Sequence, residues 1–522
     1  MTPFGHLIFH FLKRMFSGED EEGVESMSLG LGVVLAFLAS PGALASLFLL
    51  DKYSTLLQFF RGQRHFDPYR ASIADEYFFI VLSMTVTGLV MVLRWNRLFP
   101  DRRDFWNLAV LPIPIRQVFL ANFTALFLLA VIFAIDVNAV STVLFPAFVT
   151  MSDGSFAAFF RTAGAHAAAV LSASLFSFFA IFALVGILML VSPPRWFRNI
   201  SVAARTVLVV ALLVEFVSNI FVQLLSGRLP GHAGDYARFL PPFLFLRIYR
   251  GVGASVPLTA LGASIVIAVA AYSLCYRRHF LRLAESLDTL GAGRHVTRFP
   301  SPGWLFRSQW ERGCTLFSLK VLLRNERHVL LLGAYLGIGL VMSAGVDLLA
   351  LPLLIAFFLI SGLRFIFDIP ATVAANWIFR VAAGVPHPTP RAIARRFLLF
   401  AVLPWQIAFP LSWQAVTLDM LFSALGIELV LRGYRKIAFT CNSKPDTSQM
   451  VIRVVGLIVT ILVLIPVLTG IERWALQSLW RFGTLAFSLG GALWAARGKS
   501  DEDEPLVFED RPAAAFELLK LA

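Results

Sequence analysis

Long runs of apolar residues recur along the whole chain, and they constrain its fold more than any other feature. A helix needs about 18–20 apolar residues to cross roughly 30 Å of hydrocarbon, and many runs reach that length. Of the 522 residues, 58% are hydrophobic and only 15% are charged, whereas about a quarter are charged in soluble domains. Membrane β-barrels alternate apolar and polar residues instead of forming apolar blocks. The sequence therefore predicts an all-α polytopic membrane protein.

Hydropathy windows predict about 12 transmembrane helices in two six-helix halves. The predicted spans are Ser28–Leu50, Glu76–Leu93, Val118–Ile135, Ala163–Leu190, Ala204–Leu225, Val256–Tyr276, Val329–Gly345, Ala350–Phe367, Phe397–Pro410, Val416–Leu431, Val451–Leu468 and Trp474–Ala496. The first half takes in residues 1–300 and the second residues 301–500, and residues 501–522 form an acidic tail. The ninth and tenth spans are short and carry prolines, so tilted or re-entrant helices remain alternatives for them.

Basic residues set the expected orientation. The net charge is +13, and most arginines stand at the ends of apolar runs, where the positive-inside rule and anionic lipid headgroups favour them. We expect both termini on the cytoplasmic side of the inner membrane, contact with membrane lipid, and no nucleic-acid partner. The three cysteines have no CxxC spacing, so we expect free thiols without a metal role.

Each half is preceded by an amphipathic stretch. In residues 1–16, Phe4, Leu7, Phe11 and other apolar side chains share one helical face, and Lys13 and Arg14 follow. This pattern is typical of an interfacial helix. A similar basic, amphipathic stretch, Thr315–Arg327, precedes the second half.

Two loops resemble each other and support an internal repeat. The second span ends at Arg94 and Pro100 follows six residues later; the eighth span contains Arg364, and Pro370 again follows six residues later. Other shared features are Trp106-Asn107 in the first loop, Asn376-Trp377 in the second, and the arginines Arg116 and Arg391 before the next spans. Six spans repeated in parallel would relate the halves by an axis along the membrane normal.

The first loop, Arg94–Arg116, carries large apolar groups that membrane orientation does not require. Phe105 and Trp106 lie among charges, and prolines at 112 and 114 would stop a short helix. Aromatic and arginine anchors are typical of protein interfaces. We therefore favour a docking helix over the alternative, a solvated connector whose arginines only set the orientation.

The segment DRRDFWNLAVLPIPIRQVFLANFTAL resembles the stretch between the second and third spans of ABC-2 type permeases. Leu111, Pro112, Ile113, Arg116 and Val118 match the family pattern, and Asn122 replaces its usual lysine. The start LLRNERHVLLL (Leu322–Leu332) resembles the juxtamembrane start of such permeases. These short motifs cover about a tenth of the chain, and the repeated interfacial helix plus six spans would extend the likeness to a fused double permease.

In that family the loop after the second span docks onto a separate ATP-binding cassette subunit. The resemblance thus implies an exporter driven by ATP and Mg on partner subunits. It implies partner-coupling residues in both loops: Arg102, Arg103, Asp104, Phe105, Trp106, Pro112 and Arg116 in the first, and Pro370, Asn376, Trp377 and Arg380 in the second. The substrate is not implied.

The chain itself lacks motifs for chemistry. Its nearest phosphate-loop string, Gly498-Lys499-Ser500, has Leu493 where the motif needs glycine. We expect no enzymatic activity, cofactor, catalytic residue or metal site in this chain.

Two alternatives rest on acidic residues. Glu215 lies mid-span and is a candidate for the substrate path or for the proton site of a proton-coupled secondary transporter, although pairing with an arginine is commoner. Asp75-Glu76 would suit a membrane enzyme acting on lipid-linked substrates, although an acidic helix N-terminus explains the pair more simply. For Asp419 and Glu428 in the tenth span, Asp136 near the end of the third and Asp347 just outside the seventh, we expect solvated positions near a membrane interface.

Overall fold

The computed structural model describes residues 2–16, 40–54, 67–95, 98, 112–226, 240–285, 308–343, 346–369, 390–440, 456 and 460–498. These residues form helices and no β-strand, which confirms an all-α protein. Six helices among them are long and apolar enough to span a membrane, so the chain is a membrane-spanning protein. A total of twelve spans stays a prediction. The chain divides into two compact units, Met1–His295 and Val296–Ala522.

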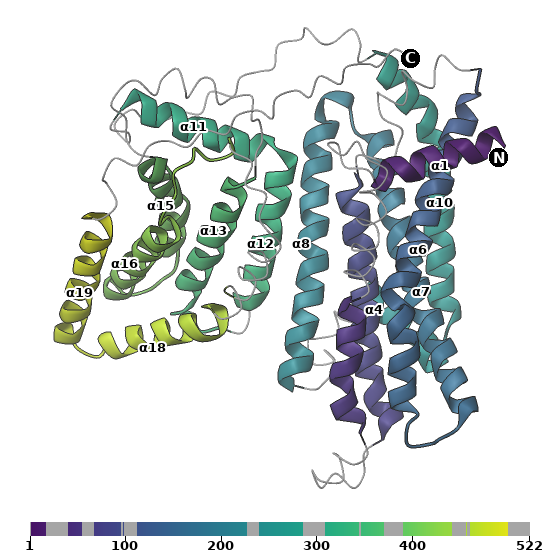
Figure 1. Ribbon diagram of the computed structural model, residues 1–522, viewed down its shortest axis with the longest axis horizontal. Coiled ribbons are helices and arrows are strands. Elements are labelled where there is room, and N and C mark those ends of the chain that lie inside the picture. Colours follow the sequence, from purple (N-terminus) through teal and green to yellow (C-terminus); the bar gives the residue numbers. More distant parts are fainter. Residues whose placement is uncertain are drawn as a thin grey trace, which may run out of the picture. The chain divides into compact units, whose positions relative to one another are not determined.

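The first unit is a bundle of long helices crossed by one short helix (Figure 1). Its helices are α1 (Pro3–Phe16), a helix over residues 40–53, α4 (Pro68–Leu93), α6 (Ile115–Val149), α7 (Phe156–Val191), α8 (Pro194–Ser226), α9 (Pro241–Arg250) and α10 (Ser255–Glu285). The amphipathic helix α1 packs against α6, with Leu7 and Phe11 buried and Phe9 exposed. Five of the six candidate spans belong to this unit.

Helices α4 and α7 of the first unit begin earlier than the spans that hydropathy predicts, because capping residues stabilise the earlier starts. The Asp67 side chain accepts hydrogen bonds from the backbone N–H groups of Tyr69 and Arg70, so α4 begins at Pro68 and not at Glu76. Ser155 accepts one from the N–H of Ala158 and starts α7. Asp75 and Glu76 therefore lie two turns inside α4, and an acidic helix N-terminus does not explain them.

Glycines lie at close contacts between helices of the first unit. A Cβ atom at Gly88 of α4 would come within 2.8 Å of a Leu212 side-chain carbon on α8. A Cβ atom at Gly186 of α7 would come within 2.8 Å of the Ala271 side chain on α10. Small residues of this kind let membrane helices approach backbone to backbone.

The second unit is built from shorter helices. They are α11 (Gln309–Arg324), α12 (Glu326–Ser343), α13 (Leu351–Phe367), α15 (Pro390–Ala408), α16 (Trp413–Val430), the π-helix η5 (Thr460–Leu464), α18 (Ile465–Ala475) and α19 (Leu479–Gly498). Only α16 among them meets the length and hydropathy of a span, and α13 is a shorter apolar helix. The main core lies among α13, α15 and α16, where Phe367, Leu398 and Phe439 are buried.

Two helix boundaries in the second unit differ from those predicted from the sequence. Ser308 caps the backbone N–H of Glu311, and the Asn325 side chain accepts from the N–H of Arg327. The amphipathic segment is therefore a separate helix, α11, that ends one residue before Asn325. The last predicted span, Trp474–Ala496, is interrupted between α18 and α19, so its helix begins only at Leu479.

Candidate functional site

Most of the predicted partner-coupling residues lie outside the described residues. This holds for Arg102, Arg103, Asp104, Phe105 and Trp106 in the first loop, and for Pro370, Asn376, Trp377 and Arg380 in the second. Their roles stay predictions. The described ends of the first loop are residues 94, 95 and 98 on one side and residues from Pro112 onward on the other.

The first residues of that loop are held against α6. Trp95 and Leu98 are buried, and the Asn122 side chain of α6 donates a hydrogen bond from Nδ2 to the Leu98 carbonyl at 2.8 Å. Asn122 is the residue that departs from the permease pattern, and its buried amide suits this neutral carbonyl partner. On the other side of the loop, Pro112 and Arg116 are exposed.

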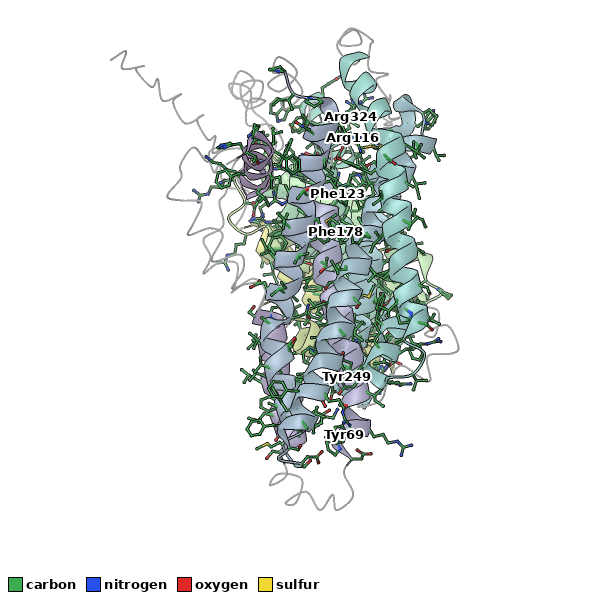
Figure 2. The ribbon with its side chains drawn as sticks, turned by 90° about the vertical axis from the view of Figure 1, so that its right-hand side faces the viewer. Tyr69, Arg116, Phe123, Phe178, Tyr249 and Arg324 are labelled. Atoms are coloured by element: carbon green, nitrogen blue, oxygen red, sulfur yellow. The ribbon has the colours of Figure 1, made fainter. Side chains whose placement is uncertain are left out.

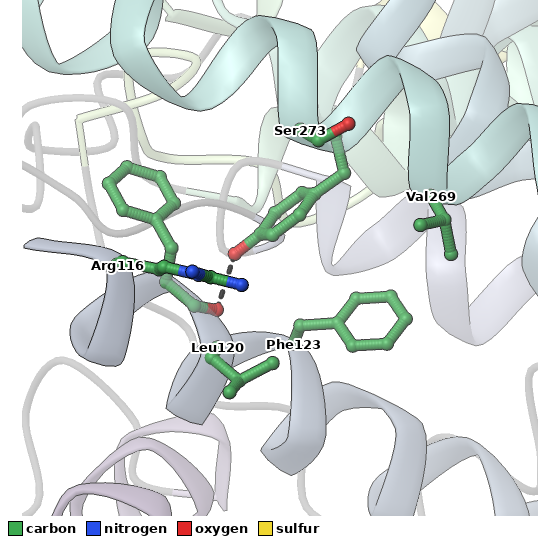
Figure 3. A pocket seen from close by; sticks show the side chains of 7 residues that line it. Arg116, Leu120, Phe123, Val269 and Ser273 are labelled. Atoms are coloured by element: carbon green, nitrogen blue, oxygen red, sulfur yellow. Dashed lines mark hydrogen bonds between the residues drawn. The ribbon is translucent and has the colours of Figure 1, made fainter.

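An open pocket of about 280 Å³ adjoins this end of α6 (Figure 3). It is lined by Arg116, Phe119, Leu120 and Phe123 of α6 and by Val269, Tyr272 and Ser273 of α10. The Tyr272 hydroxyl donates a hydrogen bond to the Phe119 carbonyl at 2.5 Å. This bond ties the two helices together at the level of the pocket.

Buried polar side chains gather toward the opposite end of the first unit. Figure 2 shows Tyr69 and Tyr249 at that end and Arg116 at the other. Asp75 is buried there, and its carboxylate accepts hydrogen bonds from Lys52 Nζ at 2.7 and 2.8 Å and from the Tyr53 hydroxyl at 2.5 Å. The charge of Asp75 is thus neutralised by a partly exposed lysine.

Glu76, the neighbouring acid, has a different partner. Its Oε2 lies 2.6 Å from Nδ1 of His166 on α7, and neither side chain is exposed. The other ring nitrogen of His166 lies 3.3 Å from the Ser141 hydroxyl of α6. Phe79 and Phe145 pack against the imidazole ring, which holds its plane in place.

Further polar contacts join the same three helices. The Asn138 amide of α6 donates to the Ser83 hydroxyl of α4 at 2.8 Å, and the Ser83 and Ser174 hydroxyls of α4 and α7 bond to each other. One turn along α7 from Ser174, the Ser177 hydroxyl donates to the Met84 carbonyl of α4 at 3.0 Å. Helices α4, α6 and α7 are therefore cross-linked by side-chain hydrogen bonds, the kind of contact that joins helices in membranes.

The sequence Glu76–His166–Ser141 follows the bonding order of a serine hydrolase triad. Ser141 is only 1% exposed, however, and its hydroxyl donates to the Asn138 carbonyl within its own helix at 3.1 Å. A substrate carbonyl cannot reach that oxygen in this conformation. His166 was not singled out from the sequence, although a lone histidine inside an apolar run is a recognisable signal.

Glu215 lies on α8, the fifth predicted span. Its Oε1 atom is buried without a hydrogen-bond partner in the part of the chain that the structure describes. The neighbouring Phe216 packs against Phe78 of α4, with ring centroids 6.2 Å apart. The expected pairing with an arginine is not found among the described residues, so a role in a substrate path stays a prediction.

The prediction that Asp419 and Glu428 are solvated is wrong. Both are buried, because α16 is enclosed by α13, α15 and α19. The Glu428 carboxylate contacts three arginines: Arg391 at 3.2 Å, Arg395 at 3.1 Å and Arg497 at 3.3 Å. This cluster ties α15 and α19 to α16, and the hydrogen bonds from its arginines explain how the acid can be buried.

The described residues contain no group of three His, Cys, Asp or Glu side chains that could hold a metal ion. The polar cluster and the loop end therefore stand as candidate sites without a metal assignment. Comparison with protein-family models, known proteins and solved structures finds no match to this chain.

Proposed function

We propose that this chain is the membrane-spanning permease subunit of an ATP-driven ABC exporter. It would reside in the inner membrane with both termini cytoplasmic, and ATP-binding cassette subunits would bind ATP and Mg and dock onto the two loops. The resemblance around residues 111–118 and the long apolar helices support this proposal. The exported substrate is unidentified.

The attachment of the first loop to α6 carries the proposal. Trp95 and Leu98 are buried and Asn122 binds the Leu98 carbonyl, so a force on the loop would pass directly into α4 and α6. The hydrogen bonds among α4, α6 and α7 would then transmit it to three helices together. A loop that only set orientation would need no such attachment.

A pull-down of the detergent-solubilised protein tests the docking. Replacing Arg103, Phe105 and Trp106 with alanine should release an ATP-binding subunit and leave the chain in the membrane. A matched control replaces Phe156, Phe160 and Arg250, which are exposed near the opposite end of the first unit, and should retain the subunit. If no ATPase co-purifies with the unaltered protein, the proposal fails.

The loop attachment has a test of its own. Asn122→Ala removes the bond to Leu98 without touching the predicted docking residues. We expect the ATP-binding subunit to stay bound while the stimulation of its ATP hydrolysis by the bound permease falls. Unchanged stimulation would show that force does not pass through this contact.

A proton-coupled secondary transporter is the second candidate, and the buried Glu215 oxygen that has no hydrogen-bond partner among the described residues favours it. Glu215→Gln should abolish uptake driven by a pH gradient if this candidate is right. The exporter proposal instead predicts ATP-dependent transport that persists in the variant.

The membrane-enzyme alternative is weakened, because Asp75 and Glu76 are already engaged by Lys52, Tyr53 and His166.

A further inference from the structure

The pocket between α6 and α10 opens on the outer surface of the first unit. Two of its lining side chains, Leu120 and Val269, are 51% and 49% exposed. Both belong to candidate membrane spans, Arg116–Val149 and Ser255–Cys275. The groove therefore faces outward from helices that lie in lipid.

The walls of the groove are apolar and preformed. Phe119 and Phe123 of α6 pack against the Tyr272 ring, with centroids 6.0 and 5.5 Å apart. The single hydroxyl of that ring is already bonded to the Phe119 carbonyl, and Ser273 donates to the Ala270 carbonyl. Alkyl groups could fill such a groove without burying a polar atom that lacks a hydrogen bond.

A positively charged side chain, that of Arg116, lies at the mouth of the groove. Arg116 is exposed and pairs with no acidic side chain in the described ranges. It begins a membrane span, at the level where phosphate headgroups lie. The helix also starts there without a side-chain cap, because Pro114 at its N-cap makes no such bond. The backbone N–H groups of the first turn add positive potential at the same point.

We propose that this groove binds one anionic phospholipid of the surrounding bilayer. Its phosphate would contact Arg116 and the start of α6, and part of one acyl chain would lie between Phe123 and Val269. Basic pockets between membrane helices bind anionic headgroups in this way. The proposal concerns only the first unit and holds whichever energy source drives transport.

Native mass spectrometry of the full-length, delipidated protein tests the site by titration with phosphatidylglycerol or phosphatidylcholine. We expect tighter binding of phosphatidylglycerol. Arg116→Gln should weaken its binding about fivefold, the effect of one arginine near a membrane surface, and should weaken binding of phosphatidylcholine, whose choline offsets the phosphate charge, by less. Arg250→Gln, an equally exposed arginine at the C-terminal end of α9, is the matched control and should change nothing.

Val269→Trp fills the groove and should remove the tightest bound lipid of either kind. Because this variant could also disturb folding, a phosphatidylglycerol with a photoreactive acyl chain is crosslinked to the unaltered protein. The crosslinks should map to the segments containing Phe123 and Val269. Crosslinks elsewhere, equal losses in the Arg116 and Arg250 variants, or displacement of the lipid by millimolar inorganic phosphate would overturn the proposal.

Discussion

Glu76 illustrates how far a single residue can be understood from its neighbours in the sequence. Its place near an end of the second span followed from hydropathy, but its partner His166 is 90 positions away and joins it only through the packing of α4 on α7. An unpaired carboxylate in that position would cost several kcal/mol. The contact between Glu76 and His166 is therefore a consequence of the tertiary structure that no local pattern reveals.

Replacing His166 by alanine should destabilise the protein by about 3–5 kcal/mol, because it leaves the buried Glu76 carboxyl group without its histidine partner. Combining it with Glu76→Gln should recover part of that loss, since no charge is then left unpaired. The midpoint of thermal unfolding in detergent measures both effects. If the loss of stability in the double variant equals the sum of the losses in the two single variants, the two residues do not act as a pair.

Cys314 on α11 gives a second prediction at this scale. Burial, with Glu311 nearby, raises the pKa of its thiol to about 12. Only the thiolate reacts with maleimides, and it is scarce below that pKa. In a chain with Cys275 and Cys441 changed to serine, labelling of Cys314 at pH 8 should be slow in the folded protein and fast after unfolding. Rapid labelling of the folded protein would mean that α11 does not bury this thiol.

At the level of the helices, hydropathy located the cores of the long spans but missed their ends. The caps Asp67 and Ser155 were visible in the sequence, and capping rules applied to them would have placed the starts of α4 and α7 correctly. Capping rules could not predict that α6 continues past Asp136 to Val149. Its polar residue Asn138 is accepted inside the bundle because its amide donates to Ser83 of α4 and to the Ala134 carbonyl of its own helix.

Helix packing gives a matched pair of glycine variants. Gly186→Leu should push α7 away from Ala271 on α10 and destabilise the first unit by about 1–3 kcal/mol. Gly262→Leu on α10, where a Cβ atom meets nothing within 4 Å, should have little effect. Unfolding midpoints of the two variants test this difference, and equal shifts would argue against close packing of α7 on α10.

At the scale of the whole chain, the two units have separate cores. The fold class and membrane character were predictable, because they depend on composition and on the length of apolar runs. Most predicted coupling residues lie outside the described residues, so their placement is untested. The polar cluster of α4, α6 and α7 was beyond sequence reasoning, because its members come from three separate spans.

Because each unit has its own core, we expect residues 1–295 and 296–522 to insert into the membrane when they are produced as separate chains. Extraction with mild detergent, followed by size-exclusion chromatography of each piece, measures this. Aggregation of the first unit alone, but not of the full chain, would show that its core needs residues beyond 295.

The length of α6 and α7 has a consequence for the choice of bilayer. Their apolar segments Arg116–Val149 and Phe156–Val191 contain 34 and 36 residues, or about 51–54 Å of helix. Even a tilt of about 40° leaves roughly 40 Å of helix along the bilayer normal, against a hydrocarbon layer of about 30 Å. Lipids with short acyl chains would leave part of the hairpin unmatched. Acyl-chain length is therefore a variable that any reconstitution of this protein should control as closely as headgroup charge.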